Sequence, residues 1–220
     1  MENTAFTRRN LVAGLAAIGA VALAARTQGP EAAKQQPAPT AGRWNQAWPN
    51  CTLTTHDGRQ VKFYDDLIRN KLVVINVMFA RCFGICPMMT RNLLNVQSML
   101  GNRVGKEVFM YSITLRPEED TPGVLKEYAE MHEVKPGWQF LTGRPADIES
   151  VRNKLGFYDP DPELDRNPDT HTGALKIGND AYQRWAMAPS LAEPRQIVTS
   201  ILHLDRTQSA QALSKALNQA

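Results

Sequence analysis

Apolar residues follow two different patterns along this chain. Almost continuous apolar runs occur at residues 71–79 (KLVVINVMF) and 108–115 (VFMYSITL), and such runs are typical of central strands that are covered on both faces. Between these runs, apolar residues recur from Met89 to Leu100 at intervals of 4, 3 and 4, which marks one face of a helix. The pattern therefore predicts a strand, a helix and a second strand in succession.

Strands and helices continue to alternate downstream. Thr-Pro at 121–122 is expected to open a helix, and WQFL at 138–141 is a short strand. A further helix is expected over Pro145–Leu155, where it is stopped by Gly156, and the last helix of the domain over residues 194–203.

Two hairpins complete the predicted architecture. The first covers residues 52–66 (TLTTHDGRQVKFYDD) with its turn at Asp57-Gly58, and the second covers residues 171–187 with its turn at Gly-Asn-Asp, 178–180. Strands that alternate with helices, followed by a hairpin and a helix, predict an α/β fold. The expected fold is a thioredoxin-like sandwich with an N-terminal β-hairpin and a hairpin insertion before the last helix.

The first 25 residues are expected to be an export signal of the twin-arginine type. Arg8 and Arg9 precede an apolar, Ala/Gly-rich run at 11–25, which is shorter than the about 20 residues of a spanning helix. Leu11 stands where such signals usually have phenylalanine. The prediction places the protein in the periplasm, with membrane attachment only through an uncleaved N-terminal anchor. The alternative is an Ala-rich N-terminal helix of a cytosolic protein.

The remaining chain divides by composition. Residues 26–46 are polar and rich in Pro, Ala and Gln, which predicts a flexible linker, and residues 47–205 are expected to form one domain. The tail, 206–220, has an apolar stripe that predicts a short helix. The formal net charge of +3 and the lack of a basic stripe interleaved with aromatics argue against a nucleic-acid partner. The sequence has no GxGxxG, P-loop or GxSxG motif, which argues against dinucleotide, phosphate and serine-hydrolase chemistry.

The stretch RCFGICPMMT at 81–90 holds two of the three cysteines. Cys82 and Cys86 are expected on the turn between the first central strand and its helix, with Pro87 at the first helical position. The helix N-terminus and the neighbouring Arg81 would both favour the thiolate, which is the nucleophilic and the metal-binding form. A redox disulfide, half of a soft-metal site, a structural disulfide and two buried small residues all remain open on this pattern.

A metal site would need further ligands, and the sequence has four histidines. His56 is expected at the surface of a turn, His132 in the core or at its rim, and His203 at the end of the last helix. His171 follows an irregular loop, 159–170, and precedes a strand. In a thioredoxin-like fold this loop can hang over the cysteine-bearing turn, so His171 is a candidate ligand.

Two other sulfur-containing residues have simpler interpretations. Met89 fits the apolar stripe of its helix and is expected in the core rather than at a metal, although thioether sulfur does bind Cu(I). Cys51 occupies an apolar position of the first hairpin and is expected to be a buried small hydrophobe.

The combination of CFGICP, LRPEEDTPGVLKEYAE, FLTGRPADIESV and a later histidine resembles the Sco/SenC family of copper chaperones over about residues 48–204. The resemblance implies that Cys82, Cys86 and His171 are ligands of copper, as Cu(I) or Cu(II). It also implies delivery to the copper-centre subunit of a respiratory oxidase, or to another periplasmic copper protein. The family usually has Pro-Asp after the first cysteine, and this chain has Phe83-Gly84. The departure removes a negative charge beside the thiols, which bears on redox potential and partner docking.

Three functions are therefore compared. The first is a copper carrier that uses Cys82, Cys86 and His171, which is a metal-binding protein rather than an enzyme. The second is a thiol–disulfide oxidoreductase that cycles Cys82 and Cys86 without a metal, and the third is a redox-sensing module. His171 separates the first two, because dithiol exchange does not require it and a three-ligand site does.

Overall fold

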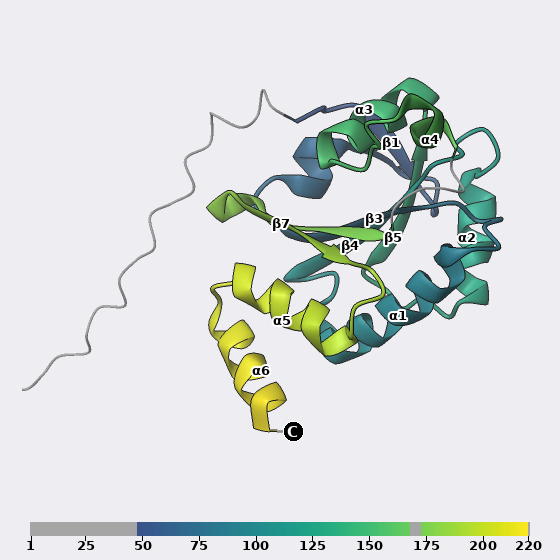
Figure 1. Ribbon diagram of the computed structural model, residues 1–220. Helices are drawn as coiled ribbons and strands as arrows, with labels where there is room; N and C mark the ends of the chain where they lie inside the picture. Colours follow the sequence, from purple (N-terminus) through teal and green to yellow (C-terminus); the bar gives the residue numbers. More distant parts are fainter. Residues whose placement is uncertain (1–47, 168–172, 220) are drawn as a thin grey trace, which may run out of the picture. The chain divides into compact units, whose positions relative to one another are not determined.

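The computed structural model describes residues 48–167 and 173–219 (Figure 1). Contacts divide the chain into two units, Met1–Pro37 and Ala38–Ala220, and every described residue belongs to the second unit. The export signal predicted at 1–25 and the linker predicted at 26–46 lie outside the described residues.

The described chain contains one mixed sheet of seven strands in the order β2-β1-β5-β4-β3-β6-β7. The three central strands β5, β4 and β3 are parallel, and both hairpins join them in antiparallel fashion. The strands are β1 Thr52–Thr55, β2 Gln60–Lys62, β3 Leu72–Met78, β4 Val108–Thr114, β5 Trp138–Gly143, β6 Ala174–Asn179 and β7 Arg184–Pro189.

Helices cover both faces of this sheet, with α1 and α5 on one side and α3 on the other (Figure 1). The α-helices are α1 Ile85–Leu100, α2 Pro122–Met131, α3 Pro145–Leu155, α4 Pro162–Arg166, α5 Pro194–Leu204 and α6 Gln208–Gln219. Shorter turns are the π-helical η1 Phe63–Ile68 and the 3₁₀ turns η2 Gly101–Arg103 and η4 Asp180–Tyr182. This architecture is the predicted thioredoxin-like sandwich.

The alternation of β3 divides the core into two clusters. Leu72, Val74 and Met78 face α1, α2 and α5, and Val73 and Ile75 face η1 and α3. All seven residues of β3 are buried, as the continuous apolar run predicts. Met89 of α1 is fully buried in the first cluster, which confirms its interpretation as a core residue.

The second hairpin differs from its prediction. The turn does not form at residues 178–180, because β6 continues through Asn179, whose side-chain amide donates to the Leu204 carbonyl at 2.9 Å. The chain instead reverses through η4, and Gln183 adopts the left-handed conformation with φ 53°. Gly178 pairs with Trp185 of β7, and a Cβ there would lie 2.0 Å from the indole ring. This glycine makes room for a tryptophan rather than for a turn.

The tail forms the helix expected from its apolar stripe. Ala210 of α6 is buried in the core on the α5 side of the sheet, and Leu213 and Leu217 pack against that core.

A buried polar network joins the start of this helix to the β3–β4 crossover. Arg103 pairs with Asp205 through Nη2 and with Glu107 through Nε at 2.9 Å.

The described part of the chain has no helix suited to crossing a bilayer. Among residues 48–167 and 173–219, no helix combines the necessary length with the necessary apolar character.

Candidate metal centre

Two thiols meet where β3 gives way to α1. We call residues 79–86 the cysteine turn; it leaves the carboxyl end of the central strand and enters the helix at Ile85. Cys82 is 8% exposed and Cys86 is fully buried, no disulfide links them, and a side-chain hydrogen bond joins their sulfurs. Pro87 is the third helical residue, not the first as predicted, because the helix begins two residues earlier.

Burial sets the protonation of the inner thiol. Desolvation raises the pKa of Cys86, and the hydrogen bond with Cys82 raises it further, while a hydrogen bond with the Phe79 backbone lowers it. The sequence-based expectation that the helix N-terminus and Arg81 would favour a thiolate is therefore wrong for Cys86 in the metal-free chain. Arg81 is exposed to solvent, where its field is screened, whereas Cys86 has no contact with water.

A buried carboxylate fixes the base of the cysteine turn. Oδ2 of Asp120, a residue 1% exposed, accepts the Ala80 amide at 3.1 Å and the Thr114 hydroxyl at 2.5 Å. Asp120 thereby connects the cysteine turn to the end of β4 and to the start of α2. Desolvation raises the pKa of Asp120, and the two hydrogen bonds oppose that rise.

A buried pair of hydroxyl groups, from Thr90 and Tyr128, links α1 to α2. The hydroxyls of Thr90 and Tyr128 lie 2.8 Å apart, and Thr90 follows Cys86 by one helical turn. Burial raises the pKa of Tyr128 to about 12. The thiols therefore rest on a scaffold in which α1 is hydrogen-bonded to α2 rather than only packed against it.

Cys82 opens to solvent through a small pocket. The pocket has a volume of about 340 Å³ and is lined by Phe79, Arg81, Cys82, Phe83, Gly84, Ile85 and Arg116. Cys86 does not line it, so a molecule that approaches from solvent reaches Cys82 first.

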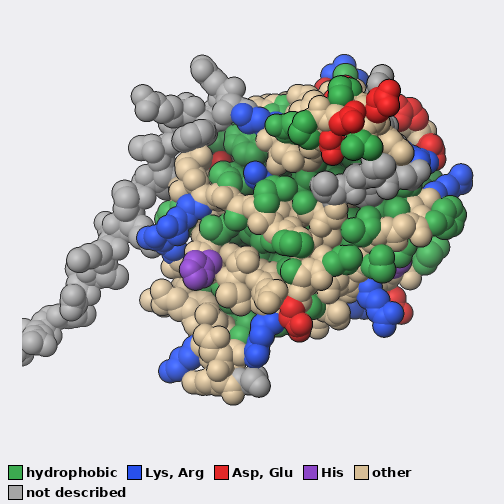
Figure 2. Space-filling view, in the orientation of Figure 1, with side chains coloured by type: hydrophobic (Ala, Val, Ile, Leu, Met, Phe, Trp, Pro, Cys, Tyr) green, Lys and Arg blue, Asp and Glu red, His purple; other side chains and the backbone are tan. Residues whose placement is uncertain are grey.

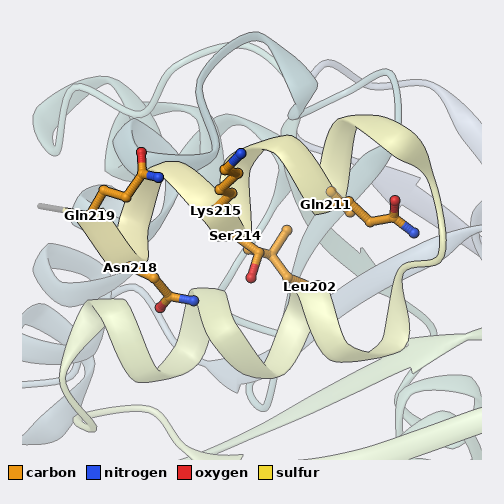
Figure 3. A pocket seen from close by; sticks show the side chains of 7 residues that line it. Leu202, Gln211, Ser214, Lys215, Asn218 and Gln219 are labelled. Atoms are coloured by element: carbon orange, nitrogen blue, oxygen red, sulfur yellow. The ribbon is translucent and has the colours of Figure 1, made fainter.

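A larger groove, elsewhere on the described surface, contains neither sulfur nor imidazole. It lies between α5 and α6, holds about 450 Å³, and is lined by amide, hydroxyl and lysine side chains with Leu202 and Ala210 (Figure 3). It offers no ligand for a soft metal.

His171 lies outside the described residues, but its neighbourhood in the sequence is visible. Gly173, two residues later, is so close to the cysteine turn that a Cβ there would lie 2.3 Å from Cδ1 of Ile85. The Gly173 carbonyl accepts the Ser190 amide at 2.7 Å. Gly173 therefore lies directly beside Ile85, the residue that precedes Cys86.

The other candidate residues lie elsewhere. His56 was expected at the surface, but its side chain is only 15% exposed. Its Nδ1 accepts a hydrogen bond from the Phe140 amide at 3.1 Å. His132 lies at the rim of the core with its ring centroid 4.4 Å from that of Tyr128, and His203 is exposed at the end of α5. Cys51 is half-buried against the α3 side of the sheet. No three His, Cys, Asp or Glu side chains within residues 48–167 and 173–219 are grouped closely enough to hold a metal.

The loop that leads to residue 168 is tied to α3. Both carboxylate oxygens of Asp165 accept from Arg152, at 2.5 and 2.7 Å, and Oδ1 also accepts the Asp159 amide at 2.8 Å. The Arg152 hydrogen bonds are the main cause that lowers the pKa of Asp165 to about 2.

This ion pair predicts an acid-sensitive contribution to stability. Because the folded-state pKa lies below the ordinary value of about 3.9, the contribution is complete above that value and is lost as the pH falls toward about 2. Asp165→Asn is expected to lower the free energy of unfolding by about 1 kcal/mol or less at pH 7, since the pair lies near the surface. Urea unfolding at pH 7, 4 and 2.5 should show the two proteins converging. A difference that stays constant with pH would contradict the prediction.

The SCO1/SenC family model matches residues 43–204, which include the cysteine turn and every strand. The chain belongs to the SCO1/SenC family. A "SCO2-like protein" of Rickettsia prowazekii is 33% identical over 97 residues, which are 44% of this chain and 45% of that relative. The matched part thus spans under half the length of this curated relative.

Solved structures show the same fold as this SCO1/SenC chain. The copper-bound ScoI of Bradyrhizobium japonicum has a TM-score of 0.57 and 21% identity, covering 70% of this chain and 96% of that one. The protein BsSco, described as having a disulfide switch and as a member of the Sco family of cytochrome c oxidase assembly proteins, has a TM-score of 0.56 and 21% identity. The alignment with BsSco covers 70% of this chain and 91% of that one.

Sequence reasoning missed two supports of this SCO1/SenC site. In the sequence, Asp120 is simply the residue before the N-cap of α2. That cap is Thr121, whose hydroxyl accepts the Val124 amide at 3.3 Å. The contact of Asp120 with Ala80 joins positions 40 apart in the sequence, which no local pattern reveals. Arg116, in the loop after β4, is also distant from Cys82 in the sequence and lines the same pocket.

Proposed function

We propose that this chain binds one copper ion through Cys82, Cys86 and His171 and delivers it to the copper centre of a respiratory oxidase. The observation that carries the proposal is the hydrogen-bonded thiol pair, held at the end of a central strand in a chain of the SCO1/SenC family. Copper is cargo in this function, and the chain is a carrier rather than an enzyme.

The chemistry of the thiol pair suits a soft metal. Two thiolates favour Cu(I), and one imidazole would complete a near-trigonal site that an acceptor could enter from the open side. Metal binding requires both thiols to lose their protons, and the bound cation offsets the desolvation that holds Cys86 protonated in its absence. The close approach of Gly173 to Ile85 supports His171 as the third ligand, because only Thr172 separates that contact from the histidine.

The protein is proposed to act outside the cytoplasm. The basis is the paired Arg8-Arg9 before the short apolar run at 11–25. In a compartment where disulfides persist, Cys82 and Cys86 would oxidise unless copper or a reductant protects them.

A second function, thiol–disulfide exchange, is favoured by the unequal exposure of the two sulfurs. Cys82 lines the pocket and would attack an incoming disulfide, and the buried Cys86 would then attack the mixed disulfide and release the reduced substrate. Such an oxidoreductase would prepare the thiols of the oxidase for copper. It has no need of His171.

His171→Ala separates the two functions. With the thiols left intact, Cu(I) affinity is expected to fall at least about tenfold and Cu(II) binding to be lost, since Cu(II) prefers nitrogen and oxygen ligands. Reduction of a model disulfide is expected to continue at the wild-type rate. Competition titrations with both copper ions, with disulfide reduction measured in parallel, provide the test.

The matched control is His203→Ala, which removes an exposed imidazole at the end of α5. It should leave copper affinity unchanged. Unchanged copper affinity in a folded His171→Ala protein would remove His171 from the site and favour the oxidoreductase.

A further inference from the structure

The surface in front of the cysteine turn is apolar. The side chain of Phe83 is 100% exposed, and that of Met88 in α1 is 56% exposed. Figure 2 shows hydrophobic side chains gathered on this face where α1 begins, with Lys and Arg side chains at the edge. Phe83 thus buries none of its ring against the chain that carries it, although aromatic rings contribute most where they are buried.

The segment that carries Phe83 and Met88 is positively charged. Residues 81–100 contain Arg81 and Arg91 and no aspartate or glutamate. Both arginines are exposed, and neither forms an ion pair with any residue in 48–167 or 173–219. The N-terminus of α1 adds its partial positive charge at the same end. Arg116 also lines the pocket, but Glu119 lies 3.5 Å from it and offsets its charge.

We propose that Arg81, Phe83, Met88 and Arg91 form a docking surface for an acidic protein domain that receives the copper. Phe83 is the anchor that enters an apolar hollow of that domain, and the two arginines pair with carboxylates around it. Aromatic residues, arginine and methionine are the types enriched at the centres of protein interfaces. The inference rests on the proposed function, because docking here would bring the acceptor to the pocket that exposes Cys82.

The arrangement fits a protein better than a small anion. Small ligands have most of their surface enclosed by their sites, and a fully exposed Phe83 encloses nothing. From Ile85 to Arg91 the helix also rises about 9 Å, so the exposed side chains extend well beyond the pocket. An extended apolar surface with charge at its edge has the anatomy of a protein interface.

The test measures association of the full chain, loaded with copper, with the soluble copper-centre domain of the host's oxidase in its metal-free form. Phe83→Ala is expected to weaken the complex about tenfold or more. Arg81→Glu is expected to slow association and to reduce its dependence on salt between 20 and 200 mM. Arg81 and Phe83 line the pocket beside Cys82, so the copper content and copper affinity of each variant are measured first, and association is compared between fully loaded proteins.

Two matched controls change residues of the same kinds outside the proposed docking surface. Met131→Ala removes a 77% exposed apolar side chain from α2, and Arg59→Glu reverses an exposed charge in the first hairpin. Both should leave the complex unchanged.

The outcomes distinguish the two proposals. A wild-type chain that binds no copper contradicts the proposed function, and the docking surface falls with it. A Phe83→Ala protein with unchanged affinity overturns the docking surface alone. A copper-loaded wild type that forms no complex overturns the docking surface and delivery to this domain, and leaves copper binding standing.

Discussion

Copper binding by this chain is expected to fall at least about 100-fold when either Cys82 or Cys86 is replaced by serine. A serine hydroxyl has almost the size of a thiol but is not a soft ligand, and it stays protonated near neutral pH. Losing a ligand should cost at least as much as the 10–100-fold loss that accompanies removal of a residue behind the ligands. Oxidation to the Cys82–Cys86 disulfide should have the same effect, because a disulfide offers no thiolate.

The measurement is a Cu(I) competition titration under anaerobic conditions, with metal content determined after desalting. Cys51→Ser is the matched control, because it removes the third thiol from the opposite face of the sheet and should bind copper normally. Since Cys86 is fully buried, its serine variant also needs an unfolding curve, and Cys82→Ser provides a less buried second case. Stoichiometric, tight copper binding by a folded Cys82→Ser protein would refute the site.

The free energy of unfolding is expected to fall by about 3 kcal/mol in Asp205→Ala. Asp205 is the buried partner of Arg103, and Nη1 of that guanidinium already lacks a partner among the described residues. Removing the carboxylate leaves a buried charge to Glu107 alone, which is 41% exposed and also accepts the Ser209 hydroxyl at 2.6 Å. An uncompensated buried charge is among the larger penalties that a single substitution can cause.

Urea unfolding checks this value, and Asp57→Asn is the control. Asp57 faces His56 across 3.6 Å and is 51% exposed, so its loss should change the free energy of unfolding by no more than about 0.5 kcal/mol. A double variant, Arg103→Met with Asp205→Leu, should be more stable than Asp205→Ala because it removes both charges together. A loss well below 1 kcal/mol in Asp205→Ala would show that water compensates the guanidinium.

The parts of the fold that sequence predicts well are those whose local and tertiary preferences agree. The helix Pro145–Leu155 was predicted with these bounds, since proline suits its first position and Gly156 supplies the left-handed residue, φ 84°, beyond its end. The strand β3 was equally clear, because burial on both faces leaves a nearly continuous apolar run.

The sequence-based predictions fail where the environment of a residue is set by a partner distant in the sequence. Gly178 was interpreted as a turn residue because glycine favours turns, yet it accommodates the ring of Trp185 from the facing strand. The protonation of Cys86 was predicted from Arg81 and the helix terminus, which are visible in the sequence, and burial of the thiol by the completed fold outweighs both. The placement of Asp120 beneath the cysteine turn belongs to the same class.

The position of Cys51 on the other side of the sheet limits the oxidation states that one molecule can adopt. Three cysteines allow three pairwise combinations, and two of them would have to bridge a layer of seven strands. Disulfide geometry requires Cα atoms within about 7 Å, so the folded chain can form a single internal disulfide. Within one molecule, the thiols therefore have two states, the reduced dithiol and the Cys82–Cys86 disulfide. Equilibration with a redox buffer should accordingly give a single reduction potential and no mixture of disulfide isomers. Any disulfide that includes Cys51 must join this chain to a second thiol-bearing molecule, so the mass of the product identifies it directly.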